Sequence, residues 1–568
     1  MTAAQSTPAP AKYDAPGFSA PIDLDLSRNE GACAIADLAG ALASVEPSML
    51  ECYPDILPLQ RRLARHVGLD PDRVVVTTGG DEGIDRAIRV AIRSGRTRVL
   101  GHDPSFEMIG VSTVNAGATL DTISWLEGAF PVDAFCAAID ASVAAVVLVT
   151  PNNPTGAAID LPDIRRVVDR AAEVGAMALI DLAYVEFAAD DPTHTLLEMP
   201  NVVIVRTLSK AWGLAGLRIG YLLASEELSD TLRNAGGPFP VSGVSLHLAE
   251  KALDAGGIDI DGFQRRKARL GAIVGSIGGR PWASDANFVL AQVPDAAWLR
   301  DALASLGIAV RRFPSSPELA DCLRITVPTN DAALDRLESA LRIVSAPQAV
   351  LFDMDGVLAE VSTSYRRAIV KTARHFGVEV TPVEIGEAKR RGGANNDWEL
   401  TDRLLAAAGV DVPFDQIRSV FESVYHGTEA QPGLKMTESL LVDPSDLRSL
   451  ATRYPLAIVT GRPRADALEF LDRFDIRDVF EVIISMEDGP AKPDPAPVHR
   501  AMEALRVERA WMIGDTVDDI NASRAAGVLP IGVVPRGDAF DETYAALMNA
   551  GSAVAYETTE QCMERLPS

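Results

Sequence analysis

Short apolar runs alternate with helix-like stretches through most of this 568-residue chain. The clearest runs are Val74–Val76, Val99–Gly101, Ala145–Thr150, Ala178–Asp181 and Val202–Arg206. Repeated β–α alternation predicts a mainly parallel sheet covered by helices, an α/β fold. Functional side chains collect at the carboxyl ends of the strands in such sheets. The residues that follow each run are therefore the first candidates for chemistry.

Length and composition narrow the class of protein. A chain of 568 residues exceeds one typical core, so two to four domains are expected. A formal charge of −26 argues against nucleic acid as a partner, because its phosphates require a basic face. Five separated cysteines without a CxxC pattern favour reduced thiols in the cytoplasm over disulfides or zinc. We expect no signal peptide and no membrane span, and we interpret residues 1–21 as a flexible leader.

The most informative stretch follows the run Val202–Val205. Ser209 and Lys210 come four and five residues after it, and Arg218 follows eight residues past the lysine. A lysine among apolar neighbours can form a Schiff base with an aldehyde, and an arginine can clamp a phosphate. Aldehyde and phosphate on one small ring describe pyridoxal phosphate (PLP). A surface lysine is the alternative, but only eight of the 53 basic residues are lysines.

Three further segments lie where a sheet of this kind would place a site. The Gly-Gly of Thr77–Asp85 follows a strand and can present N–H groups to a phosphate, although alone it also fits an ordinary turn. Pro151–Gly156 follows another strand and also fits a plain loop. Asp181 ends an apolar run, where a carboxylate is costly unless it has a partner such as a protonated ring nitrogen. Tyr184 follows it closely.

Taken in order, these segments match a known family. The matching motifs are Asn29-Glu30, Tyr53-Pro54, Gly80-Asp81-Glu82, Pro104-Ser105-Phe106, Asn152–Gly156, Asp181–Tyr184, Thr207–Lys210, Arg218 and Leu323–Thr326. The set resembles the fold-type I PLP aminotransferases and, within them, the histidinol-phosphate aminotransferases, over residues 22–345. The resemblance implies a large domain at about 50–255 and a small domain built from both ends.

The resemblance also implies roles for the residues around the cofactor ring. Lys210 would carry the Schiff base and shuttle a proton. Asp181 would pair with the pyridinium nitrogen, and Tyr184 and Asn153 would hydrogen-bond the phenolic oxygen. Phe106 would stack on the ring, at a position where the family often has tyrosine.

The phosphate side and the dimer are implied in the same way. The residues expected to hold the cofactor phosphate are Gly80, Asp81, Thr207, Ser209 and Arg218. Tyr53 would reach into the site of a neighbouring subunit, which implies a homodimer.

Two arginines resemble the pair that holds the substrate phosphate in the histidinol-phosphate enzymes. They are Arg324 and, thirteen residues upstream, Arg311. Arg312 fits the second position equally well, in which case Arg311 is a solvated loop charge. Leu182 replaces the acidic residue that usually follows the family's aspartate, and no function is attached to that change.

A second strand-like pattern begins after a short linker at residues 346–348. Asp353 and Asp355 follow the apolar run Ala349–Phe352, and period-two spacing directs both side chains to one side. Adjacent carboxylates repel unless a cation lies between them, and Mg²⁺ prefers oxygen ligands. A structural aspartate pair in a turn is the alternative for this motif alone.

Three later signals complete a pattern. Thr460, Lys492 and the pair Asp515 and Asp519 each follow an apolar run or lie in a loop. Together with the first motif they resemble the four motifs of the haloacid dehalogenase superfamily, a Rossmann-like fold, over residues 349–568.

This second resemblance implies a phosphatase. Asp353 would be the nucleophile and Asp355 the acid and base, while Thr460 and Lys492 would neutralise phosphoryl oxygens. Asp515 would hold Mg²⁺ with Asp353 and the Asp355 carbonyl. Asp519 would support either the metal site or Lys492.

The sequence between the first two motifs predicts an inserted helical cap at about 363–450. Helix periodicity covers Thr363–Phe376, Asp397–Ala408 and Phe414–Tyr425, which resembles the cap of the phosphoglycolate-phosphatase-like branch. The Gly-rich loop 392–398 either reads the substrate or is an ordinary cap turn. Arg462 is a candidate substrate contact, with a surface ion pair as the alternative.

The two halves suggest consecutive chemistry. Our hypothesis is a bifunctional enzyme of histidine synthesis. It would transfer an amino group from glutamate to imidazole-acetol phosphate and would then hydrolyse histidinol phosphate to histidinol. The alternatives are a pair acting on another phosphorylated keto or amino substrate, a phospho-amino-acid decarboxylase in the first half, and a binding or regulatory module in the second. The intact second-half motif set argues against the last of these.

Overall fold

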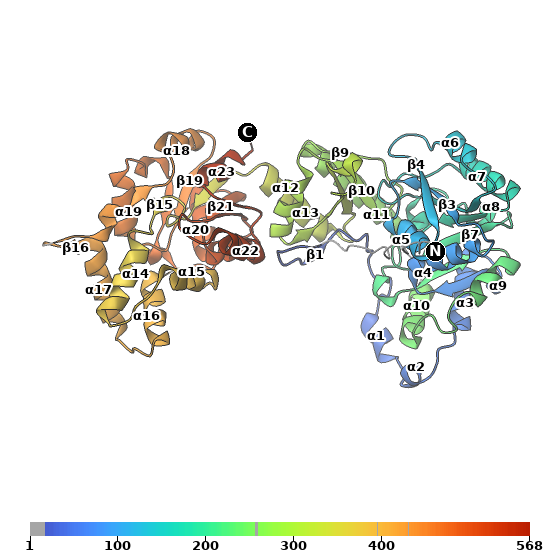
Figure 1. Cartoon of the computed structure of the whole chain (residues 1–568), viewed down its shortest axis with the longest axis horizontal. Helices are drawn as coiled ribbons and strands as arrows, with labels where there is room; N and C mark the ends of the chain where they lie inside the picture. The colour runs from blue at the N-terminus through green and yellow to red at the C-terminus, as the bar shows by residue number, and fades with distance from the viewer. Residues whose placement is uncertain (1–16, 256–258, 395, 430, 568) are drawn as a thin grey trace, which may run out of the picture. The chain divides into compact units, whose positions relative to one another are not determined.

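The computed structural model describes residues 17–255, 259–394, 396–429 and 431–567 (Figure 1). These residues form two compact units. The first comprises Leu26–Ala296 and Val310–Leu334, and the second comprises Gly17–Asp25, Ala297–Ala309 and the chain from Asp335 onward. Most of the expected leader, residues 1–16, lies outside the described residues. No described helix is long and apolar enough to cross a membrane.

A seven-stranded sheet forms the centre of the first unit. In spatial order it contains β2 (Val74–Thr77), β8 (Gly220–Leu223), β7 (Val202–Thr207), β6 (Met177–Asp181), β5 (Val143–Val149), β3 (Arg98–Asp103) and β4 (Thr119–Ser124). All neighbours are parallel except β8, which is antiparallel to both β2 and β7. The predicted mainly parallel sheet is confirmed, and each of the five predicted strands is present.

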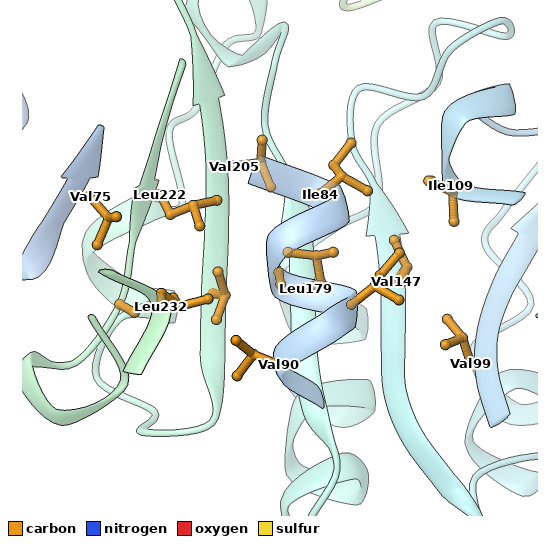
Figure 2. Close-up of a cluster of buried hydrophobic side chains, with 14 of the residues drawn as sticks. Val75, Ile84, Val90, Val99, Ile109, Val147, Leu179, Val205, Leu222 and Leu232 are labelled. Atoms are coloured by element: carbon orange, nitrogen blue, oxygen red, sulfur yellow. The ribbon is translucent and has the colours of Figure 1, made fainter. Parts of the chain in front are cut away.

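Helix α4 (Gly79–Ile92) packs on this sheet and forms its main apolar core. Figure 2 shows Ile84 and Val90 of α4 beside Val147, Leu179 and Val205, which come from β5, β6 and β7. Burying each such side chain contributes about 1.5–3 kcal/mol. The first turn of α4 is thereby fixed at the carboxyl edge of the parallel strands.

A smaller antiparallel sheet in the same unit has the order β12 (Arg311–Arg312), β13 (Cys322–Thr326), β10 (Phe288–Gln292) and β9 (Arg280–Pro281). Helix α11 (Ile260–Ser276) packs against β9 and β10. The register places Arg311 directly opposite Arg324 and Arg312 opposite Leu323. Residues directly opposite one another project from the same face, so Arg311 and Arg324 share a face.

The second unit is built on a six-stranded parallel sheet. Its order is β20 (Val482–Ile484), β19 (Leu456–Val459), β14 (Ala349–Phe352), β21 (Ala510–Gly514), β22 (Leu529–Val533) and β23 (Ala555–Tyr556). The central strands are buried on both faces, as all-parallel sheets require. Trp511 of β21 donates from Nε1 to the Ile343 carbonyl (2.8 Å), which ties the end of helix α13 (Asp331–Ser345) to this sheet.

The described residues between β14 and β19 include α18 (Pro444–Ala451), just before β19, and four earlier α-helices. The four earlier helices are α14 (Tyr365–His375), α15 (Pro382–Arg390), α16 (Asp397–Ala407) and α17 (Phe414–His426). Helix α14 packs against α15, α16 and α17. The three helices predicted here are confirmed, whereas α15, which starts with a Thr381–Glu384 capping box, was not predicted.

Two candidate active sites

Lys210 and Asp181 meet at one edge of the large sheet. Asp181 ends β6 and Lys210 follows β7, and these neighbouring parallel strands pair Asp181 with Val205. The Lys210 side chain is half-buried, with buried Leu208, Ala211 and Trp212 around it in sequence. Its Nζ donates to the Arg28 carbonyl (3.2 Å) and lies 5.7 Å from the centre of the Tyr184 ring.

Asp181 is a buried carboxylate without a full counter-ion. Burial raises the pKa of Asp181 to about 7, while the Ala183 N–H (3.0 Å) and the Lys210 charge act in the opposite direction. A partner that carries a proton would remove this cost, because a buried ionised group is stable only when it is paired. The protonated ring nitrogen of PLP is such a partner, so this residue fits the cofactor.

Hydrogen bonds orient the two groups expected at the cofactor's phenolic oxygen. The Tyr184 hydroxyl accepts from Asn29 Nδ2 (3.0 Å), so its own proton is free for another acceptor. Asn153 Oδ1 accepts from Arg324 Nη1 (2.5 Å), which leaves the Asn153 amide N–H groups to donate. Asn29 is part of the Asn29-Glu30 motif, but it is distant in sequence from Tyr184, so sequence spacing could not predict their contact.

Glycines and one arginine form a cradle at the start of α4. Arg218 donates from Nη2 to Asp81 Oδ2 (2.9 Å), and both side chains are about half exposed. Gly79 has φ +79°, and a Cβ there would lie 2.6 Å from Arg218 Nη2. The helix N-terminus, the arginine and this close approach together suit a phosphate.

The remaining predicted phosphate ligands lie beside this cradle. Thr207 Oγ1 accepts from Ser209 N (3.1 Å), and both residues are buried at the end of β7. Gly80 lies against Thr207 and Val205, because a Cβ on Gly80 would contact both. The chain thus brings the five predicted phosphate-binding residues to one corner of the sheet.

The two predicted aromatic residues differ in exposure. Phe106 precedes α5 (Glu107–Asn115) and packs partly buried against the main core. Tyr53 is 82% exposed, and its ring stacks on that of Phe239 with centroids 4.5 Å apart. The site within one chain therefore does not use Tyr53.

Arg311 and Arg324 both lie near one aromatic ring. Their guanidinium carbons are 5.8 Å and 5.7 Å from the centre of the Phe313 ring. Arg311 also pairs with Glu107 (2.9 Å), and Arg324 donates to the Ser27 carbonyl (2.7 Å). The strand register assigns Arg311 rather than Arg312 to the face of Arg324, an alternative that the sequence left open.

In the second unit three aspartates converge at the carboxyl edge of the parallel sheet. Asp353 follows β14, and Asp515 and Asp519 follow β21. All three are buried, and one carboxylate oxygen from each lies within 4.8 Å of the others. Burial raises the pKa of Asp353 to about 7 and that of Asp515 well above its ordinary value, and neighbouring carboxylates add to both effects.

The arrangement fits a divalent cation. Asp515 Oδ1 is buried and has no hydrogen-bond partner among the described residues. A Cβ on Gly356 would lie 2.3 Å from Asp515 Oδ2, so the Gly356 backbone closes tightly on the cluster. Hard oxygen ligands whose three carboxylates outnumber the one lysine paired with them match the preference of Mg²⁺.

Lys492 spans this cluster. Its Nζ donates to Asp353 Oδ1 (2.8 Å) and to the Val459 carbonyl (3.0 Å), and it pairs with Asp519 Oδ1. Burial lowers the pKa of Lys492, but Asp353 and Asp519 outweigh it, so the lysine stays charged. Asp519 Oδ2 accepts from Thr516, so Asp519 both belongs to the cluster and holds Lys492.

Thr460 follows β19 on the other side of β14 and is buried. Its Oγ1 accepts from the Arg462 N–H (3.1 Å). This bond fixes the turn that presents the hydroxyl at the same strand edge as Asp353.

Arg462 is fully buried, so the surface ion pair considered from the sequence is wrong. Its Nε donates to Asp355 Oδ1 (2.5 Å), and its two terminal nitrogens pair with Glu438 (3.2 and 3.3 Å). Its guanidinium carbon also lies 4.9 Å from the centre of the Tyr365 ring. These partners are distant from Arg462 in sequence, so they could not be predicted from the sequence around it. The contact of Arg462 with substrate stays a prediction.

The cap loop docks on the core beside the aspartate cluster. Asp518 accepts from the Gly393 N–H (2.8 Å) and the Ala394 N–H (3.0 Å). The Trp398 ring stacks under Arg418, at 4.6 Å from the guanidinium carbon. Within the predicted loop 392–398, residue 395 lies outside the described residues. The sequence interpretation missed Asp518, which is next to a motif residue and could have been noticed for that reason.

Comparison with known proteins decides the family. Residues 39–341 match the family described as aminotransferase class I and II, which is more than half of the chain. The chain belongs to the class I and II aminotransferases. Residues 350–533 of this aminotransferase match a second family, the haloacid dehalogenase-like hydrolases.

Two relatives and one solved structure illustrate the similarity. The aminotransferase is 34% identical over 309 residues to the histidinol-phosphate aminotransferase of Cronobacter sakazakii, covering 52% of this chain and 84% of that protein. It is 48% identical over 200 residues to an imidazoleglycerol-phosphate dehydratase of Phytophthora nicotianae, covering 34% of this chain but only 44% of that protein. The solved histidinol-phosphate aminotransferase of Clostridium acetobutylicum shares the fold (TM-score 0.50, 20% identity, 57% of this chain and 99% of that one).

Proposed function

We propose that this aminotransferase carries out two consecutive reactions: amino transfer from glutamate to imidazole-acetol phosphate, and hydrolysis of the resulting histidinol phosphate. One observation carries the proposal. A PLP-type site with a paired Arg311 and Arg324 is fused to a buried aspartate cluster with the motifs of a phosphatase. The first reaction makes a phosphate ester, and the second removes the phosphate.

In the amino-transfer site each residue has a distinct task. PLP, when bound, supplies an aldehyde that captures the amine and a ring that accepts electrons. Asp181 keeps the ring nitrogen protonated, and Tyr184 and Asn153 donate hydrogen bonds to the ring oxygen. Lys210 Nζ removes the proton from the substrate carbon that exchanges its amino group, and it later donates that proton back to the reacting atoms. Arg311 and Arg324 hold the substrate phosphate by charge-assisted hydrogen bonds.

In the hydrolytic site the carboxylate of Asp353 attacks phosphorus, and the alkoxide of the alcohol leaves with a proton from Asp355. Water activated by Asp355 then releases phosphate from Asp353. Lys492 and Thr460 balance charge on the phosphoryl oxygens. Mg²⁺, held by Asp353, Asp515 and the Asp355 carbonyl, would supply further charge balance there, and chelation is expected to stop phosphate release.

Two finer statements belong to the same proposal. We propose a homodimer through the aminotransferase part, because Tyr53, Phe239 and Leu50 are exposed apolar side chains that a second copy would cover. Sedimentation velocity that gives only monomer at micromolar concentration would reject it.

We also propose a cytoplasmic location, where five free cysteines stay reduced. Cell fractionation tests this.

Phosphate release from histidinol phosphate by the purified protein tests the proposed function directly. Release that depends on Mg²⁺ is expected. If other phosphate esters are cleaved and histidinol phosphate is not, the pair acts on another phosphorylated keto or amino compound.

A further inference from the structure

A lysine and an aspartate in the cap form a pair that the reactions above do not use. Lys389 lies in the last turn of α15, and Asp397 is the first residue of α16. Lys389 Nζ lies 3.3 Å from Asp397 Oδ1, and the side chains are only 14% and 9% exposed. Within the described part of the chain, Asp397 Oδ1 is buried without a hydrogen bond of good geometry. Such an atom retains capacity for another donor.

This pair lies within electrostatic reach of the hydrolytic site. The charges of Arg366, Asp515 and Asp355 act on Lys389, and those of Asp355 and Arg366 act on Asp397. The loop between the pair docks on the core through Asp518, the neighbour of Asp519. Arg390 of the same cap helix pairs with Glu542 of the core (2.6 Å). The cap segment that carries Lys389 and Asp397 is therefore held on the core beside the residues that follow β21.

A purely structural role explains this pair poorly. Buried ion pairs add little stability relative to apolar residues of the same size, because both ions lose their hydration. In an ion pair that served stability alone, both carboxylate oxygens should accept well-formed hydrogen bonds, whereas Asp397 Oδ1 accepts none among the described residues. Two opposite charges near a phosphatase site instead match a substrate that itself carries charges of both signs.

We propose that Asp397 is the specificity residue of the hydrolytic site and binds the ammonium group of an amino-alcohol phosphate. This inference rests on the proposed function, because it deepens the assignment of the same site. A phosphoryl dianion entering beside Asp353 attracts Lys389 away from Asp397. The freed carboxylate then binds the substrate's ammonium group, so one ligand satisfies both members of the pair.

The selectivity has a metabolic use within one chain. The amino-transfer reaction consumes a keto phosphate and produces an amino phosphate, and both are phosphate esters. A phosphatase without discrimination would destroy the keto phosphate before it gained its amino group. An ammonium requirement at Asp397 restricts hydrolysis to the aminated product.

The test is the ratio of kcat/KM for histidinol phosphate to that for imidazole-acetol phosphate, measured on the full chain with PLP and Mg²⁺ and without glutamate. Wild type should prefer the amine. Asp397→Asn should reduce the ratio about 10- to 100-fold, which is the effect expected from losing one hydrogen bond to a charged group. Asp415→Asn, an exposed acid-to-amide change on α17, should keep the wild-type ratio. Lys389→Met should lower kcat/KM for both substrates.

Two results would overturn the inference: an unchanged ratio in Asp397→Asn, or no preference for the amine in wild type. Phosphoethanolamine against ethyl phosphate provides a second ratio. If histidinol phosphate is not cleaved but this second ratio favours the amine and falls in Asp397→Asn, the proposed function fails and the inference stands. If Asp397→Asn does not fold, Asp397→Glu keeps the charge on a longer side chain and should still lower both ratios, and ratios equal to wild type would reject the inference.

Discussion

Replacing Arg462 by methionine should destabilise the junction between cap and core by about 3 kcal/mol. The substitution leaves Glu438, which is buried, without its two guanidinium contacts at 3.2 and 3.3 Å. Removing one partner of a buried ion pair typically costs about 3–5 kcal/mol. The lower end applies here, because Ser364 (2.9 Å) and Tyr425 (3.0 Å) still donate to Glu438 and Arg473 still pairs with it (3.7 Å).

Amide hydrogen exchange followed by mass spectrometry measures this cost locally in the full chain. Peptides from α14, α17 and α19 (Arg464–Arg473) should exchange about 100-fold faster in Arg462→Met, whereas peptides from β5 and β6 should not change. Adding Glu438→Gln should recover at least half of the loss, because the side chain buried at position 438 is then neutral and only Asp355 still lacks its arginine. A loss below about 1 kcal/mol, or no recovery in the double variant, would refute the reasoning.

Three further predictions concern the two sites. Because the pKa of Asp181 is raised to about 7, the cofactor-free native state binds more protons than the unfolded state between about pH 4 and 7, so its stability should fall as pH rises through that window. Urea unfolding should show a loss of up to about 4 kcal/mol, and Asp181→Asn should flatten the profile; equal slopes would contradict the burial argument. Gly79→Ala should weaken PLP binding about 10-fold, because the added methyl group displaces Arg218. Gly216→Ala is the control, because open space surrounds Gly216 and PLP affinity should not change. Equal PLP affinities of the two variants in an absorbance titration would show that Arg218 does not bind the phosphate. Lys210→Ala should abolish amino transfer and the visible absorbance of bound PLP but leave phosphate release, while Asp353→Asn should do the converse; loss of both activities in either variant would mean that the sites are not independent.

The sequence predicted the parts of both sites that depend on local pattern. Asp181, Lys210 and Asp353 each end or follow a short apolar run that became a strand. The strands of Asp181 and Lys210 are neighbours in one sheet, and that of Asp353 lies in the other sheet. Position relative to a strand is a local property, so it could be predicted without knowing the fold.

Long-range contacts could not be predicted in the same way. The choice of Arg311 over Arg312 depends on the register of β12 with β13, and a shift of one residue would reverse it. Arg462 was predicted as a substrate contact, with a surface ion pair as the alternative, and its buried pairing with Glu438 and its place beside Tyr365 were not predicted. Contacts between the cap and the core produce no periodic pattern of residues in the sequence, so pattern analysis cannot predict them.

The pair Lys389 and Asp397 shows the same limit. The two residues are eight positions apart on different helices, and helix α15 itself was not predicted. Their closeness follows from the docking of the intervening loop on Asp518, a residue more than 100 positions away. Sequence spacing carries no information about that contact.

The central claim is that one chain performs amino transfer and then removes phosphate from its own product. The most direct measurement supplies purified protein with PLP, Mg²⁺, glutamate and imidazole-acetol phosphate, and follows 2-oxoglutarate and inorganic phosphate together. The account predicts that phosphate appears after a short lag and reaches one equivalent per 2-oxoglutarate, and that omitting glutamate suppresses it. Formation of 2-oxoglutarate without phosphate, or phosphate release that is equally fast without glutamate, would contradict it.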